Sequence, residues 1–105
     1  MPNTPRLEQL LKLLEREPND TFLIYGLALE YKKAGDLSKA IELLNRVIEL
    51  DSGYCYAYHQ KGLAYEQAGD VAAARQAYRD GITAAVRKGD SHAKAEIEAA
   101  LEHVE

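Results

Sequence analysis

Three histidines and one cysteine are the side chains of this 105-residue chain best suited to metal binding or nucleophilic chemistry. His92 and Glu96 are four residues apart, so on a helix they share a face and could supply two metal ligands. His59 and His103 fall on other predicted helices and bring no third ligand to this pair. Because protein zinc sites use at least three protein ligands, the sequence predicts no metal and no other cofactor.

Cys55 stands between Tyr54 and Tyr56, and no neighbouring charge is placed to stabilise a thiolate. We expect a small, half-buried side chain there, although the position is also compatible with a reactive surface thiol. The chain has no Ser-His-Asp set, glycine-rich phosphate loop or paired cysteine motif. The sequence therefore predicts a protein that is not an enzyme. A hydrolytic or metal-dependent activity through His92 and Glu96 is the alternative from the enzyme class.

The composition is that of a folded, helix-rich domain, with 47% hydrophobic and 29% charged residues and only 3 prolines. No apolar run approaches the roughly 20 residues needed to cross a bilayer, and the N-terminus has no stretch of signal-peptide type. We therefore expect a cytoplasmic protein with no membrane contact. The formal net charge of -4 argues against a nucleic-acid partner, because such binding depends on a basic face.

The strongest pattern is an internal repeat, seen when residues 21–54 are laid over residues 55–88. The identical pairs are Leu29/Leu63, Tyr31/Tyr65, Ala34/Ala68, Gly35/Gly69, Asp36/Asp70, Ala40/Ala74 and Ile48/Ile82. They centre on the string Tyr-x-x-Ala-Gly-Asp. Glycine there favours a helix end, because it accepts a left-handed backbone, and the aspartate can cap the next helix. Each repeat is predicted to be a helix, a tight turn and a second helix.

Further helices are predicted on both sides of the repeats. An N-terminal helix over 4–17 begins at Thr4-Pro5, ends before Pro18, and has leucines at helical spacing: Leu7, Leu10, Leu11 and Leu14. A C-terminal capping helix over 90–104 follows Gly89 and buries Ala93, Ala95, Ile97, Ala100, Leu101 and Val104. The prediction is one all-α domain over 1–105, with about six helices and repeats at 21–54 and 55–88.

With this period and this helix-turn-helix unit, the chain resembles the tetratricopeptide repeat (TPR) family. The family's pattern falls in the first repeat on Ile24, Leu27, Ala28, Tyr31, Gly35, Ala40, Leu44 and Val47. In the second repeat it falls on Tyr58, Lys61, Gly62, Tyr65, Gly69, Ala74, Tyr78 and Gly81. Lys61 and Gly81 depart from the usual Leu and Ala, and Val86 replaces the usual proline, so the last helix of this repeat can run to about Lys88. The resemblance implies a TPR-like α-solenoid of stacked antiparallel hairpins.

The resemblance also implies that a peptide or protein partner binds a concave surface formed by the first helices of successive repeats. The expected concave positions are Phe22, Tyr25, Leu29 and Lys33 in the first repeat and Tyr56, His59, Leu63 and Gln67 in the second. Some members of the family clamp a terminal carboxylate with Lys, Arg and Asn at such positions, and this chain has no such set. An apolar and aromatic face of this kind can instead bury an apolar helix or an extended segment.

The sequence alone leaves three alternatives for what covers that face. A segment of another protein is the first. A second copy of the chain is another, which would make the protein a self-associating scaffold, a homodimer or a larger assembly. The final helix could also fold back and turn the face into core. Two hairpins with single flanking helices are a lean stack, so burial in a dimer would add roughly 25 cal/mol per Å² before the cost of association.

Overall fold

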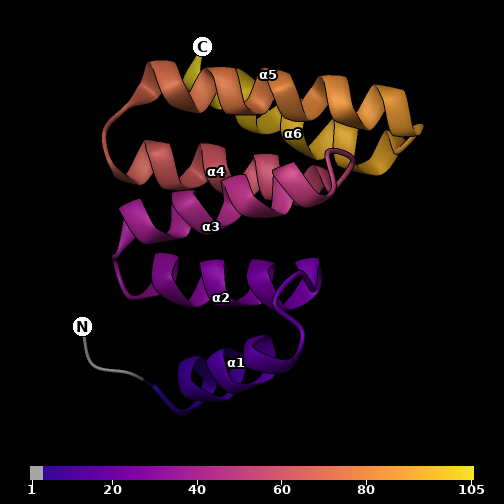
Figure 1. Ribbon diagram of the computed structural model, residues 1–105. Helices are drawn as coiled ribbons and strands as arrows, with labels where there is room; N and C mark the ends of the chain where they lie inside the picture. Colours follow the sequence, from indigo (N-terminus) through magenta and orange to yellow (C-terminus); the bar gives the residue numbers. More distant parts are fainter. Residues whose placement is uncertain (1–3) are drawn as a thin grey trace.

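The computed structural model describes residues 4–105 and contains, over that range, six α-helices and no strand (Figure 1). The helices are α1 (Pro5–Arg16), α2 (Thr21–Lys33), α3 (Leu37–Leu50), α4 (Cys55–Gln67), α5 (Val71–Lys88) and α6 (Ser91–Val104). The predicted fold class, stacked antiparallel helix-turn-helix hairpins, is confirmed. The first three residues of the expected domain lie outside the described residues.

Side-chain caps fix most of the helix starts. The carboxylates of Asp36 and Asp70, the predicted caps inside the two repeats, accept hydrogen bonds from backbone amides three residues further on, at 3.2 and 3.1 Å. The caps of α1, α2 and α6 have the same geometry and are Thr4, Asp20 and Asp90. The turns that precede α3, α5 and α6 each contain a glycine with positive φ, as the repeated string predicts. These local signals explain why the sequence breaks into helices where it does.

The helices form two layers. In the inner layer α2 contacts α4 and α4 contacts α6, whereas the outer helices α1, α3 and α5 do not contact one another. Because the inner helices lie closer together than the outer ones, the stack curves toward the inner layer. The exposed side of α2, α4 and α6 is therefore the concave side of the stack, which we call the inner face.

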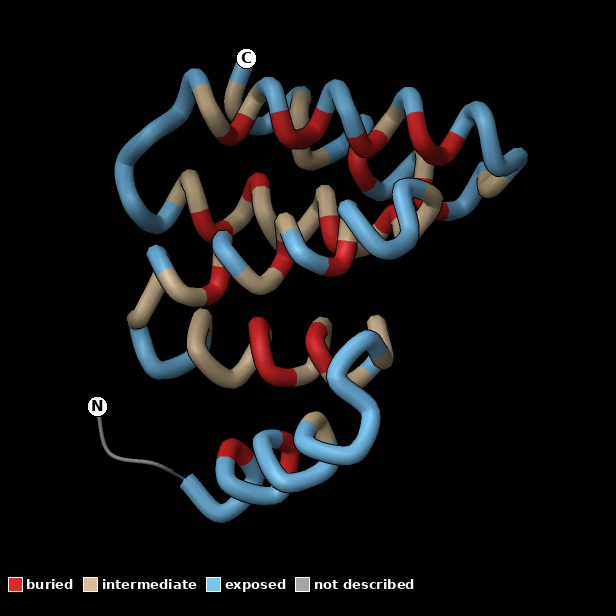
Figure 2. Tube along the Cα trace, viewed as in Figure 1, coloured by how far each residue is buried: buried red, intermediate tan, exposed pale blue. Residues whose placement is uncertain are grey.

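The core is a series of clusters between neighbouring helices rather than one central nucleus, as expected for a repeat stack (Figure 2). Leu7, Leu10 and Leu27 join α1 to α2. The middle cluster contains Ile24, Ala28, Leu44, Val47 and Ala57, and the last contains Cys55, Ala74, Tyr78, Ala85, Ala93 and Ile97.

Two helical glycines of the second repeat let helices approach closely. A Cβ at Gly62 would lie within 2.6 Å of three carbons of the Tyr78 ring, so the ring occupies the space beside this glycine. A Cβ at Gly81 would lie 2.7 Å from the Cβ of Tyr58 and 3.1 Å from Cδ1 of Ile97. A helical glycine costs about 1 kcal/mol relative to alanine. At Gly81, which departs from the family pattern, a close contact between α4, α5 and α6 offsets that cost.

Ala95, which was predicted to be buried, is exposed, and Leu11, one of the helically spaced leucines of α1, is 38% exposed. The reason is the position of their helices: α1 packs only against α2, and α6 packs only against α4 and α5, so one side of each stays open. None of the described helices is both long enough and apolar enough to span a membrane.

Candidate functional site

The α2 part of the inner face carries one aromatic side chain that is exposed to solvent and one that packs against another ring. Phe22, in the first turn of α2, is 72% exposed. Tyr25 and Leu29 follow it at helical spacing and are half-buried. The ring of Tyr25 packs against that of Tyr54, with centroids 5.1 Å apart and ring planes at 36°. Burial raises the pKa of Tyr25 above 10, so this hydroxyl stays protonated near neutral pH.

The α4 part of the face rests on the core beneath it. Tyr56 packs against the cluster that contains Ile97 of α6. The half-buried ring of His59 meets the ring of Tyr78 edge-on, with centroids 6.1 Å apart and planes at 71°. Leu63 is also half-buried. This part of the face is therefore held by packing from α5 and α6, not by α4 alone.

Tyr78 links the core to the charge on the face. It is fully buried, with its ring beside Gly62, and its hydroxyl donates a hydrogen bond to the carboxylate of Glu66. Burial, together with the bond and the negative charge of Glu66, raises the pKa of Tyr78 far above its usual range. Tyr78 thus stays a hydrogen-bond donor and fixes Glu66 on α4, one helical turn beyond Leu63.

His59 is the place where charges from all three inner helices meet. Burial lowers its pKa below 6.5, so the imidazole is mostly neutral at pH 7. Three charged groups act on it: Glu96 of α6 and Glu66 of α4 raise the pKa, and Lys32 of α2 lowers it. The centre of the inner face is therefore a neutral aromatic ring, with a cation on the α2 side and a carboxylate on the α6 side.

The structure brings some of the predicted site residues together and separates others. Tyr25 of α2 lies near Tyr56 of α4, and His59 is one turn further along α4. Lys33 instead lines a shallow depression between α1 and α2, and its neighbour Lys32 is the lysine that acts on His59. Gln67 is exposed in the last turn of α4.

Sequence reasoning overlooked three charged residues of the face, namely Lys32, Glu66 and Glu96. The signal for the first two is helical spacing, because Lys32 is seven residues after Tyr25 and Glu66 is seven after His59. The third lies on α6, which shows no repeat match in the sequence.

The last helix does not fold back over the face. It contacts α4 and α5 but not α2, so it extends the inner layer as the first helix of a third repeat would. Phe22 and the rest of the α2 part of the face consequently stay open.

The residues considered for chemistry occupy ordinary structural positions. Nε2 of His92 lies 2.8 Å from Oε1 of Glu96 in an exposed i,i+4 pair, and residues 4–105 contain no group of three potential metal ligands. Cys55 is more deeply buried than predicted, at 3% exposure, and its Sγ–H donates to the carbonyl of Gly53 at 3.3 Å. Burial raises the pKa of this thiol above 9, which disfavours the reactive thiolate.

Comparison with known proteins places this geometry among helical repeats. The family model described as "Tetratricopeptide repeat" matches residues 23–54 and 56–85. A TPR repeat-containing protein of Pseudomonas aeruginosa is 37% identical over 91 residues, which cover 87% of each chain. The solution structure of a tetratricopeptide repeat domain protein from Salinibacter ruber has a TM-score of 0.78 at 31% identity, covering 84% of this chain and 89% of that one. The TPR2B domain of yeast Sti1, solved in a complex with pHsp70, has a TM-score of 0.86 at 20% identity, covering 93% of this chain and 78% of that one.

Proposed function

This chain belongs to the tetratricopeptide repeat family, and we propose that it is a non-enzymatic interaction module that holds an apolar or aromatic segment of a partner protein on its inner face. The observation that carries the proposal is the exposed ring of Phe22 on a face that also carries the half-buried Tyr25, Tyr56 and His59. Large rings give much contact area for little lost side-chain freedom, so such a row favours burial against a ligand.

The arrangement of charge supports a mainly apolar ligand. His59 is neutral near pH 7, and Glu66 accepts the hydrogen bond of Tyr78, so the middle of the face offers rings and a methyl-bearing side chain, Leu63. Lys32 is on α2 and Glu96 is on α6, at the two sides of the face. A bound segment would therefore meet apolar contacts at the centre and one charge of each sign at its sides.

The family comparison supports a protein ligand of this kind. The TPR2B domain of yeast Sti1 shares the fold and was solved with pHsp70 bound. This chain has no Lys, Arg and Asn set of the carboxylate-clamp type at its predicted concave positions, so we propose apolar recognition and not capture of a chain end.

The proposal is tested by selecting binders from a displayed library of short random peptides and measuring one of them by fluorescence polarisation. Burying the remaining surface of Phe22 should contribute about 1.5 kcal/mol, so Phe22→Ala should weaken binding by about tenfold. Val86→Ala is the matched control, because Val86 is 60% exposed on α5, outside the inner face, and its loss should leave binding unchanged. Equal binding by wild type and a folded Phe22→Ala variant would remove the inner face as the site.

A second copy of the chain is the competing occupant, and the exposed ring of Phe22 would suit it equally well. Light-scattering mass against concentration separates the two. A monomer across the micromolar range leaves the face free for a partner segment. A dimer that Phe22→Glu splits would assign the face to self-association and replace the proposal with a scaffold function.

A further inference from the structure

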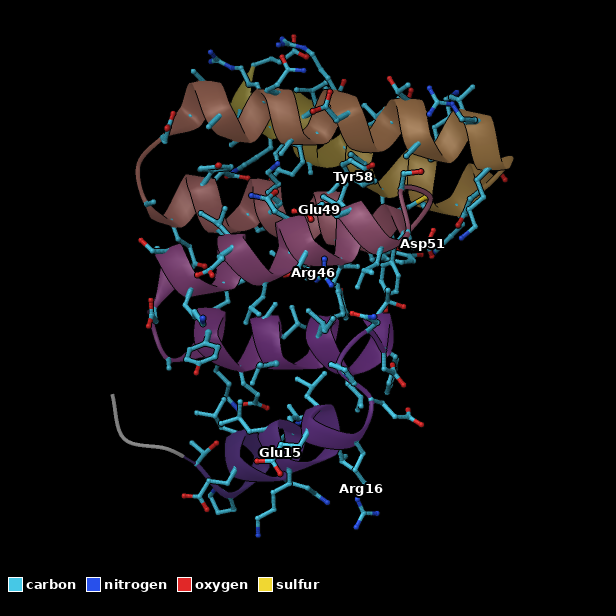
Figure 3. The ribbon with its side chains drawn as sticks, in the orientation of Figure 1. Glu15, Arg16, Arg46, Glu49, Asp51 and Tyr58 are labelled. Atoms are coloured by element: carbon cyan, nitrogen blue, oxygen red, sulfur yellow. The ribbon has the colours of Figure 1, made fainter. Side chains whose placement is uncertain are left out.

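A groove runs along the outer surface between α3 and α5, with α4 as its floor. It exists because α3 and α5 do not contact each other, and its volume is about 320 Å³. Its walls and floor include Ile48, Tyr58, Lys61, Asp80, Thr83 and Arg87. Figure 3 shows Tyr58 between the ribbons of α3 and α5, on the side of the stack opposite the inner face.

The groove is built from positions at which the second repeat differs from the first. Lys61 aligns with Leu27, which is 4% exposed and packs in the cluster that joins α1 to α2, whereas Lys61 is half-buried in the groove. Arg87 aligns with Gly53, which lies beyond the end of α3. Because α5 has 18 residues and α3 has 14, the extra turn carries Arg87 to the end of the groove. The first repeat has neither cation.

These two cations have no partner among residues 4–105: neither Lys61 nor Arg87 takes part in an ion pair or a side-chain hydrogen bond there. Two nearby carboxylates have other hydrogen-bond or ion-pair partners. Asp80 accepts from Nε2 of Gln76 at 2.9 Å, and Glu49 of α3 pairs with Arg46 at 3.6 Å.

The groove therefore carries two positive charges against the single negative charge of Asp80. An incoming anion would supply the charged partner that neither cation has within residues 4–105.

We propose that this outer groove binds the carboxylate of an acidic residue in a segment of a partner protein, with Lys61 and Arg87 as the binding residues. One carboxylate balances the net charge of the lining, whereas a phosphate, with a charge of about −2, would leave the site with a net negative charge. The planar guanidinium of Arg87 suits a carboxylate in a bidentate pair. The volume lies at the lower end of the range for ligand pockets, about 300–1,000 Å³, which suits a single side chain better than a helix. The site is separate from the inner face and does not depend on the function proposed for it.

The test uses ¹⁵N-labelled protein and a short blocked peptide whose only charged residue is one glutamate, with the glutamine version of the peptide and free acetate as comparison ligands. The glutamate peptide should give saturable shifts in the α5 amides of residues 80–87. The glutamine peptide should bind about tenfold more weakly or worse, and so should acetate, which lacks the flanking contacts.

Three variants sharpen the test. Lys61→Leu restores the residue type of Leu27 and should abolish binding in a folded protein. Arg87→Gln, a change at an exposed position, should weaken binding about tenfold without affecting the fold. Arg79→Gln is the matched control, because Arg79 is exposed on the same helix outside the groove and its loss should change nothing.

The proposal is overturned if the α5 amides show no saturable shift, or if Lys61→Leu and Arg87→Gln, both folded by circular dichroism, bind as wild type does. Equal affinity of the glutamate and glutamine peptides would remove the carboxylate from the recognition. Equal affinity of acetate and the glutamate peptide would make the groove a site for a free ion and contradict the partner segment.

Discussion

Replacing Gly62 by alanine tests the packing on which the inner face is built. A Cβ at this position would lie within 2.6 Å of three ring carbons of Tyr78, a distance that real Cβ atoms do not tolerate. The ring is fully buried and has little room to retreat. We therefore expect Gly62→Ala to displace the ring and strain or break its hydrogen bond to Glu66.

The size of the effect follows from three contributions. Overpacking a tight core costs about 1–3 kcal/mol, and loss of a hydrogen bond to a carboxylate costs about 1.5–3 kcal/mol. Alanine regains about 1 kcal/mol of helix propensity. The net expectation is a loss of about 1.5–5 kcal/mol in the free energy of unfolding, a large fraction of the stability of a domain this small.

The first repeat supplies the rescue. At the positions aligned with Gly62 and Tyr78 it has Ala28 and Leu44, both fully buried. The double variant Gly62→Ala/Tyr78→Leu recreates that pair and should recover the overpacking part of the lost stability, about 1–3 kcal/mol, but not the hydrogen bond to Glu66, whereas Tyr78→Leu alone should leave a cavity beside Gly62. Urea unfolding followed by circular dichroism measures all four proteins. A Gly62→Ala variant as stable as wild type, or a double variant no better than Gly62→Ala, would refute the packing argument.

Three further predictions concern other parts of the stack. Gly81→Ala should destabilise the protein by about 1–3 kcal/mol, because its Cβ would press on Tyr58. Gly26→Ala should stabilise the protein by up to about 1 kcal/mol, because its Cβ meets only ordinary van der Waals contacts. Changes of the same sign in the free energy of urea unfolding would contradict this. Burial lowers the pKa of His59, so the unfolded chain binds this proton more readily than the folded protein, and stability should fall as the pH drops below 6.5. The decrease in urea midpoint from about pH 7.5 to about pH 5 should be smaller in His59→Gln, and equal decreases would count against the assignment. Cys55 should resist a thiol reagent in the native protein and react at once in urea, and rapid native labelling would show that the thiol is accessible.

The helices were predictable because their signals are local. The glycine-aspartate turns mark where a helix ends and the next begins, and Asp36, Asp70 and Asp90 cap their helices as those turns suggest. The extension of α5 to Lys88 follows in the same way from the missing proline. The fold class needed only these signals and the repeat.

What the sequence did not disclose depends on neighbours. Leu11 fits the apolar stripe of α1, yet it is exposed because α1 packs against one helix alone. Lys32 and Lys33 are adjacent in sequence, and only the position of α1 shows that Lys33 points away from the inner face while Lys32 lies on it. Whether α6 would extend the inner layer or fold across it is likewise a matter of packing between helices. The short periodic pattern of α6 does not encode that choice.

The most direct test of the inner face is NMR mapping of a selected apolar peptide that carries no acidic residue, bound to ¹⁵N-labelled protein. We expect the largest amide shifts around Phe22 on α2 and around Tyr56 and His59 on α4, with smaller shifts near Glu96 on α6 and none along α3. The largest shifts on α1, α3 or α5, with the amides near Phe22 and His59 unmoved, would contradict the claim that this protein binds its partner on the inner face.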